Sequence, residues 1–201
     1  MLGTQMVAKG LDFPNVTLVG VLSADQSLYS DDFRSYERTF SLLTQVVGRS
    51  GRGTQAGKAV IQTFTPENPV IRMAAAQDYG AFYQSEIVMR KAMLYPPFAD
   101  LCVLGFVGAQ EEKTARASQS FFQRLRELAQ TRYSGIPLRV LGPSSASIAK
   151  VSNKYRYRII IKYRNCQQFR DMMSQLLIEY GKQREYADVS VFADINPERV
   201  L

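Results

Sequence analysis

Two adjacent prolines, Pro96 and Pro97, divide the chain of 201 residues into parts with different sequence patterns. Proline has no backbone N–H and holds the residue before it in an extended conformation, so a helix that approaches Tyr95 must end there. Before this point, short apolar segments alternate with residues at helical spacing, and after it longer strands and two amphipathic helices follow. We therefore expect two structural domains on either side of a helical connection.

The first part follows the order strand, helix, strand, which is typical of a parallel α/β sheet. Its first strand has the continuous apolar run of a fully buried strand, and its helix ends at Gly48. Pro66 and Pro69 then mark a boundary. We expect an α/β domain over 1–65 and a helical linker over 66–97. The predicted strand, helix, strand and two helices cover 17–22, 36–47, 58–64, 70–76 and 79–94.

The second part, 98–201, has the order β-α-β-β-α-β. This order predicts an α+β domain with a ferredoxin-like sandwich. Both predicted helices carry an apolar stripe at helical spacing, which indicates that each helix covers one face of a sheet. The predicted elements cover 101–107, 111–132, 138–141, 155–163, 167–182 and 189–193.

The charge is unevenly distributed along the chain, whose formal net charge is +7. Residues 1–100 contain nine basic and nine acidic side chains, whereas residues 101–201 contain sixteen basic and nine acidic ones. All of the excess positive charge therefore lies in the second part. This asymmetry indicates a polyanionic partner for that part.

The composition excludes several classes of site. The chain has no histidine, which excludes Ser-His-Asp triads, Cys-His dyads and His-ligated metals. Its two cysteines, Cys102 and Cys166, are too far apart for a CxxC motif, so we predict no metal site and expect both thiols to be small buried side chains in a reducing cytosol. No apolar run approaches the ~18–20 residues of a membrane-spanning helix, and the N-terminus does not resemble a signal peptide.

A cluster of glycines and arginines follows the predicted helix over 36–47. Arg49 and Arg52 lie three residues apart among Gly48, Gly51 and Gly53. Glycine permits positive φ and a close approach to a ligand, and the arginine guanidinium suits phosphate oxygens. Because no GxxxxGK[ST] motif is present, such groups would act on a phosphate bound to another surface, as arginine fingers do. The alternative is a basic surface turn.

A second basic cluster lies on and beside the predicted strand over 155–163. Alternation places its tyrosines and two of its isoleucines on a core face and its cations on the other face, with Ile160 among them. Such a cationic face suits DNA phosphates, but it also suits the solvated side of an edge strand or an acidic peptide. The basic residues of this region are Lys150, Lys154, Arg156, Arg158, Lys162 and Arg164.

Several motifs together resemble a known family. Gly3–Gln5 with Lys9–Asp12, and Gln45–Gly53, resemble motifs V and VI of superfamily 2 helicases. The stretches Asp31–Arg38, Tyr95–Phe98, Val140–Pro143 and Tyr155–Arg158 are similar to the primosomal replication-restart helicases, the PriA family (primosomal protein N′). The resemblance covers essentially the whole chain, which would be a C-terminal fragment.

The resemblance implies an ATP-dependent 3′-to-5′ DNA helicase that recognises stalled or branched forks and restarts replication by primosome assembly. Residues 1–65 would be the closing part of RecA-like lobe 2. The P-loop, the acidic Mg²⁺ site and the family's zinc ligands are absent from this sequence. We therefore expect ATP, Mg²⁺ and zinc to be cofactors of the longer protein, and the fragment to bind DNA without hydrolysing ATP.

The resemblance also implies roles for individual residues. Arg49 and Arg52 would stabilise the γ-phosphate during hydrolysis, and Gln45 would couple that phosphate to the lobe interface. Asp12 would either orient motif VI or contact the nucleotide ribose. The expected residues are Gln45, Arg49 and Arg52 for catalysis; Asp12, Gly48, Arg49 and Arg52 for ATP; and Thr4, Gln5 and Lys9 for DNA, with the six basic residues around the strand.

The implied partners are forked or branched DNA, the acidic tail of single-stranded DNA-binding protein and other primosome proteins, with no membrane. The implied location is the bacterial cytoplasm, in association with the nucleoid. Two alternatives remain: a stand-alone nucleic-acid-binding adaptor, and another superfamily 2 fork translocase. An adaptor has no need of both helicase motifs, and another translocase does not explain Tyr95–Phe98 and Val140–Pro143.

Overall fold

The computed structural model describes residues 3, 16–48 and 57–199. The elements fall into two units, Met1–Met89 and Arg90–Leu201, and each unit has its own hydrophobic core. None of the helices in the described part of the chain combines the length and the apolar character needed to cross a bilayer.

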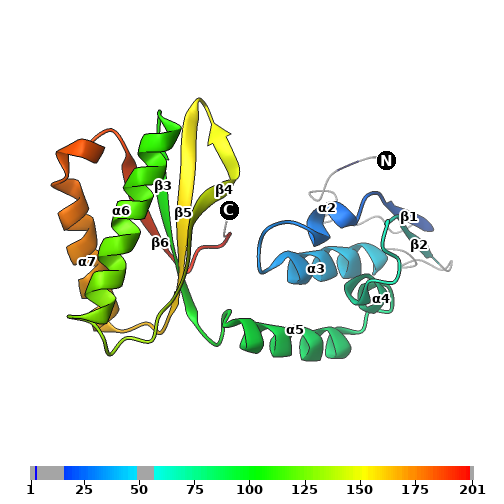
Figure 1. The fold of residues 1–201 in the computed structure, drawn as a ribbon. Helices are drawn as coiled ribbons and strands as arrows, with labels where there is room; N and C mark the ends of the chain where they lie inside the picture. The colour runs from blue at the N-terminus through cyan, green and yellow to red at the C-terminus, as the bar shows by residue number, and fades with distance from the viewer. Residues whose placement is uncertain (1–2, 4–15, 49–56, 200–201) are drawn as a thin grey trace. The chain divides into compact units, whose positions relative to one another are not determined.

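A two-stranded parallel sheet lies at one side of the first unit (Figure 1). β1 (Leu18–Val21) pairs with β2 (Lys58–Ile61) in the register Leu18 to Lys58, which confirms the predicted parallel pairing. The prediction that the first strand is fully buried is wrong, because exposed and half-buried residues alternate and Leu18 is 63% exposed. This alternation is typical of a strand that is covered on one face only.

Helices form the core of the first unit. α3 (Ser35–Val47) begins beside Asp32, whose buried carboxylate accepts from the backbone N–H of Arg34 at 2.9 Å and pairs with Arg38 at 3.0 Å. The short helix α2 (Asp25–Leu28), which the sequence pattern did not predict, adds Leu28 to the core.

α4 (Pro69–Ala75) and α5 (Tyr79–Met93) complete this core. The side chain of Asn68 accepts from the N–H of Val70 at 2.9 Å and so caps α4. Phe82 of α5 stacks on Phe40 of α3 with ring centroids 4.1 Å apart. Much of the region expected to be a linker, 66–97, therefore contributes apolar side chains to the first unit, whose boundary falls at Met89 within α5.

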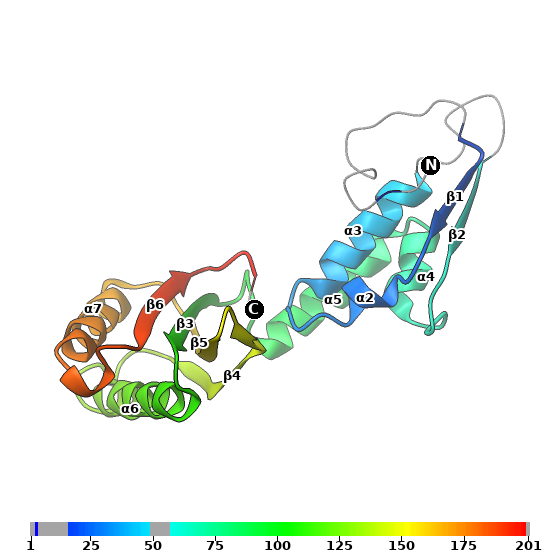
Figure 2. The same cartoon turned by 90° about the horizontal axis from the view of Figure 1, so that it is seen from above.

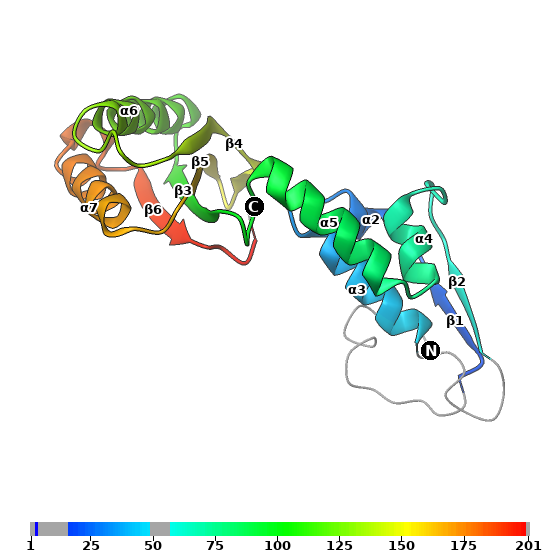
Figure 3. The same ribbon diagram turned by 90° about the horizontal axis from the view of Figure 1, so that it is seen from below.

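The second unit is a four-stranded antiparallel sheet with helices on one face. Figures 2 and 3 show α6 and α7 side by side against the sheet. The strand order is β4-β5-β3-β6, and the chain order is β-α-β-β-α-β, as the sequence predicts. The elements are β3 (Asp100–Gly108), α6 (Glu111–Gln130), β4 (Arg139–Val151), β5 (Lys154–Tyr163), α7 (Gln167–Gly181), the 3₁₀ helix η1 (Arg184–Tyr186) and β6 (Ser190–Ile195).

β4 is longer than the predicted strand over 138–141. It continues through Gly142 and Pro143 to Val151, with irregular pairing to β5 after Leu141 and after Ser145. Gly142 has φ +99°, and a Cβ at this residue would lie 2.9 Å from the carbonyl oxygen of Arg158. The glycine and proline therefore produce a bulge rather than the end of the strand, because a bulge tolerates both residues.

The core of the second unit lies between the sheet and the two helices. The stripe residues Phe121, Leu125 and Leu128 of α6 are buried there, as predicted. Cys102 on β3 is fully buried, as expected, and burial raises the pKa of its thiol to about 12. Cys166, at the start of α7, is half-buried. The side chains of α7 that are buried in this core are Phe169, Met172, Met173, Leu176 and Tyr180.

Candidate nucleic-acid interface

Six of the predicted site residues lie outside the residues that the structure describes. These residues belong to the two helicase-like motifs, and their predicted roles in ATP binding, catalysis and DNA contact remain predictions. They are Thr4, Gln5, Lys9, Asp12, Arg49 and Arg52.

Gln45 and Gly48 lie at the C-terminal end of α3. Gln45 is exposed, and its Nε2 lies 3.4 Å from the hydroxyl of Ser41, one turn earlier. Gly48 caps the helix, and its N–H donates to the carbonyl of Thr44 at 2.9 Å. Its φ of −67° is right-handed, so the freedom of glycine to adopt positive φ is not used at this residue. A Cβ here would meet the Thr44 carbonyl oxygen at 3.2 Å and Gln77 Nε2 at 3.4 Å.

β5 carries the predicted basic face. In antiparallel pairs, residues directly opposite each other share a face. Arg156 is opposite Val107 and Arg158 is opposite Gly105, whereas Ile159 and Ile161 are opposite Leu104 and Cys102, which belong to the core below the helices. The cations of β5 therefore lie on the face of the sheet away from α6 and α7. We call this side the open face.

Three of the six predicted basic residues lie on the accessible part of the open face. Lys154 is exposed at the start of β5, and Arg156 and Arg158 are half-buried. Arg164 is also exposed, but it follows the last residue of β5 and so lies just beyond the strand.

Lys162 was predicted to bind DNA, but its side chain is only 5% exposed. Its Nζ donates to the backbone carbonyl of Met93 at 2.6 Å and lies 3.5 Å from the centre of the Tyr95 ring. Burial, together with the nearby charge of Arg139 on the paired strand, lowers the pKa of this amine. Lys162 therefore links the last residue of α5 and the segment that follows it to the sheet, and it is not part of an exposed cationic row.

Lys150 lies on a different face from the one predicted for DNA binding. It is opposite Tyr155 across the β4–β5 pair, on the helix side of the sheet. Its Nζ donates to the Tyr155 hydroxyl at 3.3 Å and lies 4.6 Å from the centre of that ring. Tyr155 was expected in the core but is half-buried. Lys150 is exposed, yet its direction differs from that of Arg156.

The open face also receives residues that analysis of one strand at a time does not find. Arg139 of β4 is opposite Lys162, and Phe192 of β6 is opposite Gly105. Strand order and register bring these residues together, and neither can be obtained from alternation within a single strand. The sequence signal that could have indicated Phe192 is Gly105, a glycine in the middle of an apolar strand.

The described part of the chain gives little support for a metal site or a reactive thiol. Among residues 16–48 and 57–199, no three His, Cys, Asp or Glu side chains lie close enough together to hold a metal ion. The Cys102 thiol, with its raised pKa, stays protonated and buried at neutral pH, so it does not act as a nucleophile.

Comparison with known sequences gives consistent relatives. The profile of the family described as "Primosomal protein N C-terminal domain" matches residues 91–198. The Replication restart protein PriA of Bacillus subtilis is 42% identical over all 201 residues, which correspond to 24% of its own length. PriA of Chlamydia muridarum is 39% identical over 98% of the chain and 25% of its own length, and PriA of Treponema pallidum is 35% identical over the whole chain and 29% of its own length.

The chain thus spans about a quarter of the length of these curated relatives. The similarity includes both units, because two of these relatives match all 201 residues at 42% and 35% identity. The family profile matches most of the second unit. This chain belongs to the PriA family, and residues 91–198 are its primosomal protein N C-terminal domain.

Proposed function

We propose that this chain is the C-terminal part of an ATP-dependent 3′-to-5′ DNA helicase that recognises stalled or branched replication forks and restarts replication. In this proposal the second unit binds DNA phosphates through the open face of its sheet. The observation that carries it is the set of cations Lys154, Arg156 and Arg158 on that face, in a family of replication restart proteins. When these cations bind DNA phosphates, they would release the counterions that are condensed on the DNA.

The first unit would supply the closing part of the nucleotide site. We propose that it is the end of a RecA-like second lobe and that the second unit is a ferredoxin-like sandwich. The parallel β1–β2 pair and the strand order β4-β5-β3-β6 support these assignments. Arg49 and Arg52 follow α3, whose position is fixed by a buried core. Their guanidinium groups would stabilise charge on a phosphate held by the first lobe of the longer protein.

The P-loop that holds the ATP phosphates, the Mg²⁺ site and the zinc site would lie elsewhere in the longer protein, because the P-loop, the acidic magnesium site and the cysteine-rich region are absent from this sequence. The proposed partners are branched DNA, single-stranded DNA-binding protein and other primosome proteins, in the bacterial cytoplasm at the nucleoid. An acidic protein tail is the second candidate for the open face, since its carboxylates would also pair with the cations of β5.

The proposal is tested in the full-length protein with Arg52→Ala. We expect loss of DNA-stimulated ATP hydrolysis with DNA affinity largely retained, because the arginine acts on the phosphate and not on DNA. Wild-type turnover in this variant would remove Arg52 from the mechanism.

The purified 201-residue chain provides the complementary test. We expect it to bind DNA in a salt-sensitive manner and to show no ATPase activity, because it lacks the groups that hold the phosphates and Mg²⁺. Sustained hydrolysis above background would contradict the two-lobe assignment.

A further inference from the structure

Phe192 of β6 is a large apolar side chain on the open face, and it is 47% exposed. Register places it directly opposite Gly105 of β3, which in turn is opposite Arg158 of β5. The three residues therefore form one row across three neighbouring strands. The helices α6 and α7 lie against the other face of the sheet, as Figures 2 and 3 show, so they do not cover this row.

Gly105 determines where the Phe192 ring lies. A Cβ built on Gly105 would lie 2.1 Å from Cζ and 2.4 Å from Cε1 of that ring. The ring therefore crosses from β6 and places its tip directly over the Gly105 backbone, in space that any other side chain would occupy. The ring covers a glycine in a strand interior, and almost half of the side chain still faces solvent.

The charges around the ring are asymmetric. Arg158 lies beyond Gly105 in the same row, and Arg156 and Lys154 follow along β5 on the same face. On the other side, Asp194 shares the face of Phe192 two residues along β6. An anionic chain is therefore attracted toward β5 and repelled from the β6 edge. The Phe192 ring lies between the β5 cations and that edge.

We propose that Phe192 is a stacking platform for an unpaired base of single-stranded DNA whose phosphates follow the cations of β5. The proposal rests on the DNA-binding function proposed above and names the form of DNA that this face takes. An exposed aromatic ring beside arginine and lysine is the arrangement that binds single strands, because each base offers a π-face and each phosphate a charge. Bases inside a duplex are already stacked on both faces, so they have no free face on which the ring could stack.

The test uses Phe192→Leu in the full chain, with a single-stranded oligonucleotide and its duplex as probes. We expect about tenfold weaker binding of the single strand, since stacking contributes substantially per base. Duplex affinity and the salt dependence should stay unchanged, because leucine removes no charge. Phe192→Tyr should restore the affinity. A single strand carrying 2-aminopurine should show a change in fluorescence on binding the wild type and Phe192→Tyr that is absent with Phe192→Leu.

The matched control is Phe122→Leu on α6, the same substitution on the helix side of the sheet. Gly105→Ala provides a second variant, since its methyl group must displace the ring. We expect it to weaken single-strand binding as Phe192→Leu does. Equal losses for single strand and duplex, or equal losses for Phe192→Leu and Phe122→Leu, would overturn the proposal.

Two further outcomes separate this proposal from the one it rests on. If Phe192→Leu binds the single strand like wild type while Lys154→Ala and Arg156→Ala weaken it, stacking is wrong and DNA binding stands. If the wild type binds neither DNA probe but binds an acidic peptide in a Phe192-dependent way, both proposals fail and the face is a peptide site.

Discussion

At the scale of single residues, burial and hydrogen bonding separate cations that the sequence pattern treats alike. Lys154 and Lys162 occupy the same face of the same strand by alternation, yet Lys154 is exposed and Lys162 is enclosed by Met93 and Tyr95. An ammonium group that is enclosed in this way is not accessible to a phosphate at the surface. The two lysines therefore lie in different environments, and only Lys154 is exposed to solvent.

Lys162→Met and Lys154→Met make this difference measurable. We expect Lys162→Met to leave DNA affinity and its salt dependence unchanged, and Lys154→Met to lower both, because only Lys154 presents its charge to solvent. Fluorescence anisotropy with a labelled forked duplex over a range of salt concentrations provides the measurement. A weaker salt dependence in Lys162→Met than in Lys154→Met would show that the assignment is reversed.

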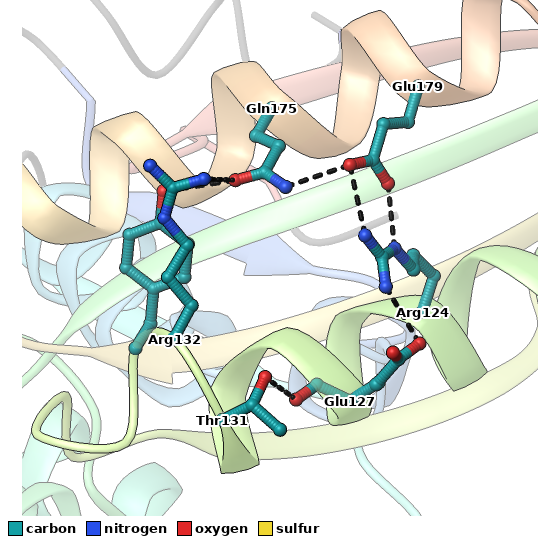
Figure 4. Close-up of polar contacts among 7 residues, drawn as sticks. Arg124, Glu127, Thr131, Arg132, Gln175 and Glu179 are labelled. Carbon is teal, nitrogen blue, oxygen red and sulfur yellow. Dashed lines mark hydrogen bonds and ion pairs between the residues drawn. The ribbon is translucent and has the colours of Figure 1, made fainter.

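At the scale of elements, a polar network fixes α6 against α7 (Figure 4). Arg124 of α6 donates through Nε and Nη2 to the two carboxylate oxygens of Glu179 on α7, at 2.7 and 3.1 Å. Gln175 donates to the same carboxylate at 2.8 Å, and Arg124 also pairs with Glu127 at 2.8 Å. The bidentate geometry sets the register of the two helices that cover the sheet.

Glu179→Gln tests this network through its pH dependence. Hydrogen bonds from Arg124 and Gln175 hold the pKa of Glu179 at about 2, below the ordinary value of 4.5. The ionised carboxylate therefore stabilises the folded state above pH 4.5, and this contribution is lost as the pH falls toward 2. In urea denaturation, wild type should be more stable than Glu179→Gln at pH 7, and the difference should shrink between pH 4.5 and 3.

Glu127→Gln is the control for that comparison. Glu127 is more exposed and makes one contact with Arg124, so its replacement should change stability less. A difference between wild type and Glu179→Gln that stays constant from pH 7 to pH 3 would contradict the ion-pair account.

Also at the scale of elements, α4 and most of α5, up to Met89, belong to the first unit. Phe82→Ala removes a buried ring that stacks on Phe40 and should lower the free energy of unfolding of that unit by about 3–5 kcal/mol. The adjacent Tyr83→Ala should have a much smaller effect, because Tyr83 is exposed. Thermal unfolding followed by circular dichroism compares the two, and equal melting temperatures would make α5 a linker rather than a core helix.

The elements were more predictable than their arrangement. Periodicity located α3, α6 and α7 within a few residues, because each buries one stripe at helical spacing. It also located α5, although Phe82 is the one buried residue of that helix. The pattern missed α2, which is a single turn, and shortened β4, because Gly142 and Pro143 are typical of a strand end as well as of a bulge. The role of Lys162 could not be predicted, because its partners come from a segment about 70 residues earlier in the chain.

At the scale of the whole molecule, sequence similarity identifies the family of the chain, and the structure shows where the charges of the second unit lie. The relatives are similar over both units, whereas the chain spans about a quarter of their length. The second unit contains all of the excess positive charge, and strand order collects part of it on one face of a sheet. We propose that the cations on this face, and not the net charge of the chain alone, bind DNA.

The salt dependence of DNA affinity tests this claim most directly. The triple variant Lys154→Ala, Arg156→Ala and Arg158→Ala is compared with a control of equal charge loss on the helix side, Arg116→Ala, Arg126→Ala and Lys182→Ala. For a forked duplex, each lost phosphate contact should reduce the steepness of the fall in log affinity with log salt by about 0.9. We predict a decrease of about 2–3 in the open-face variant and almost none in the control, whereas equal decreases in both would contradict the account.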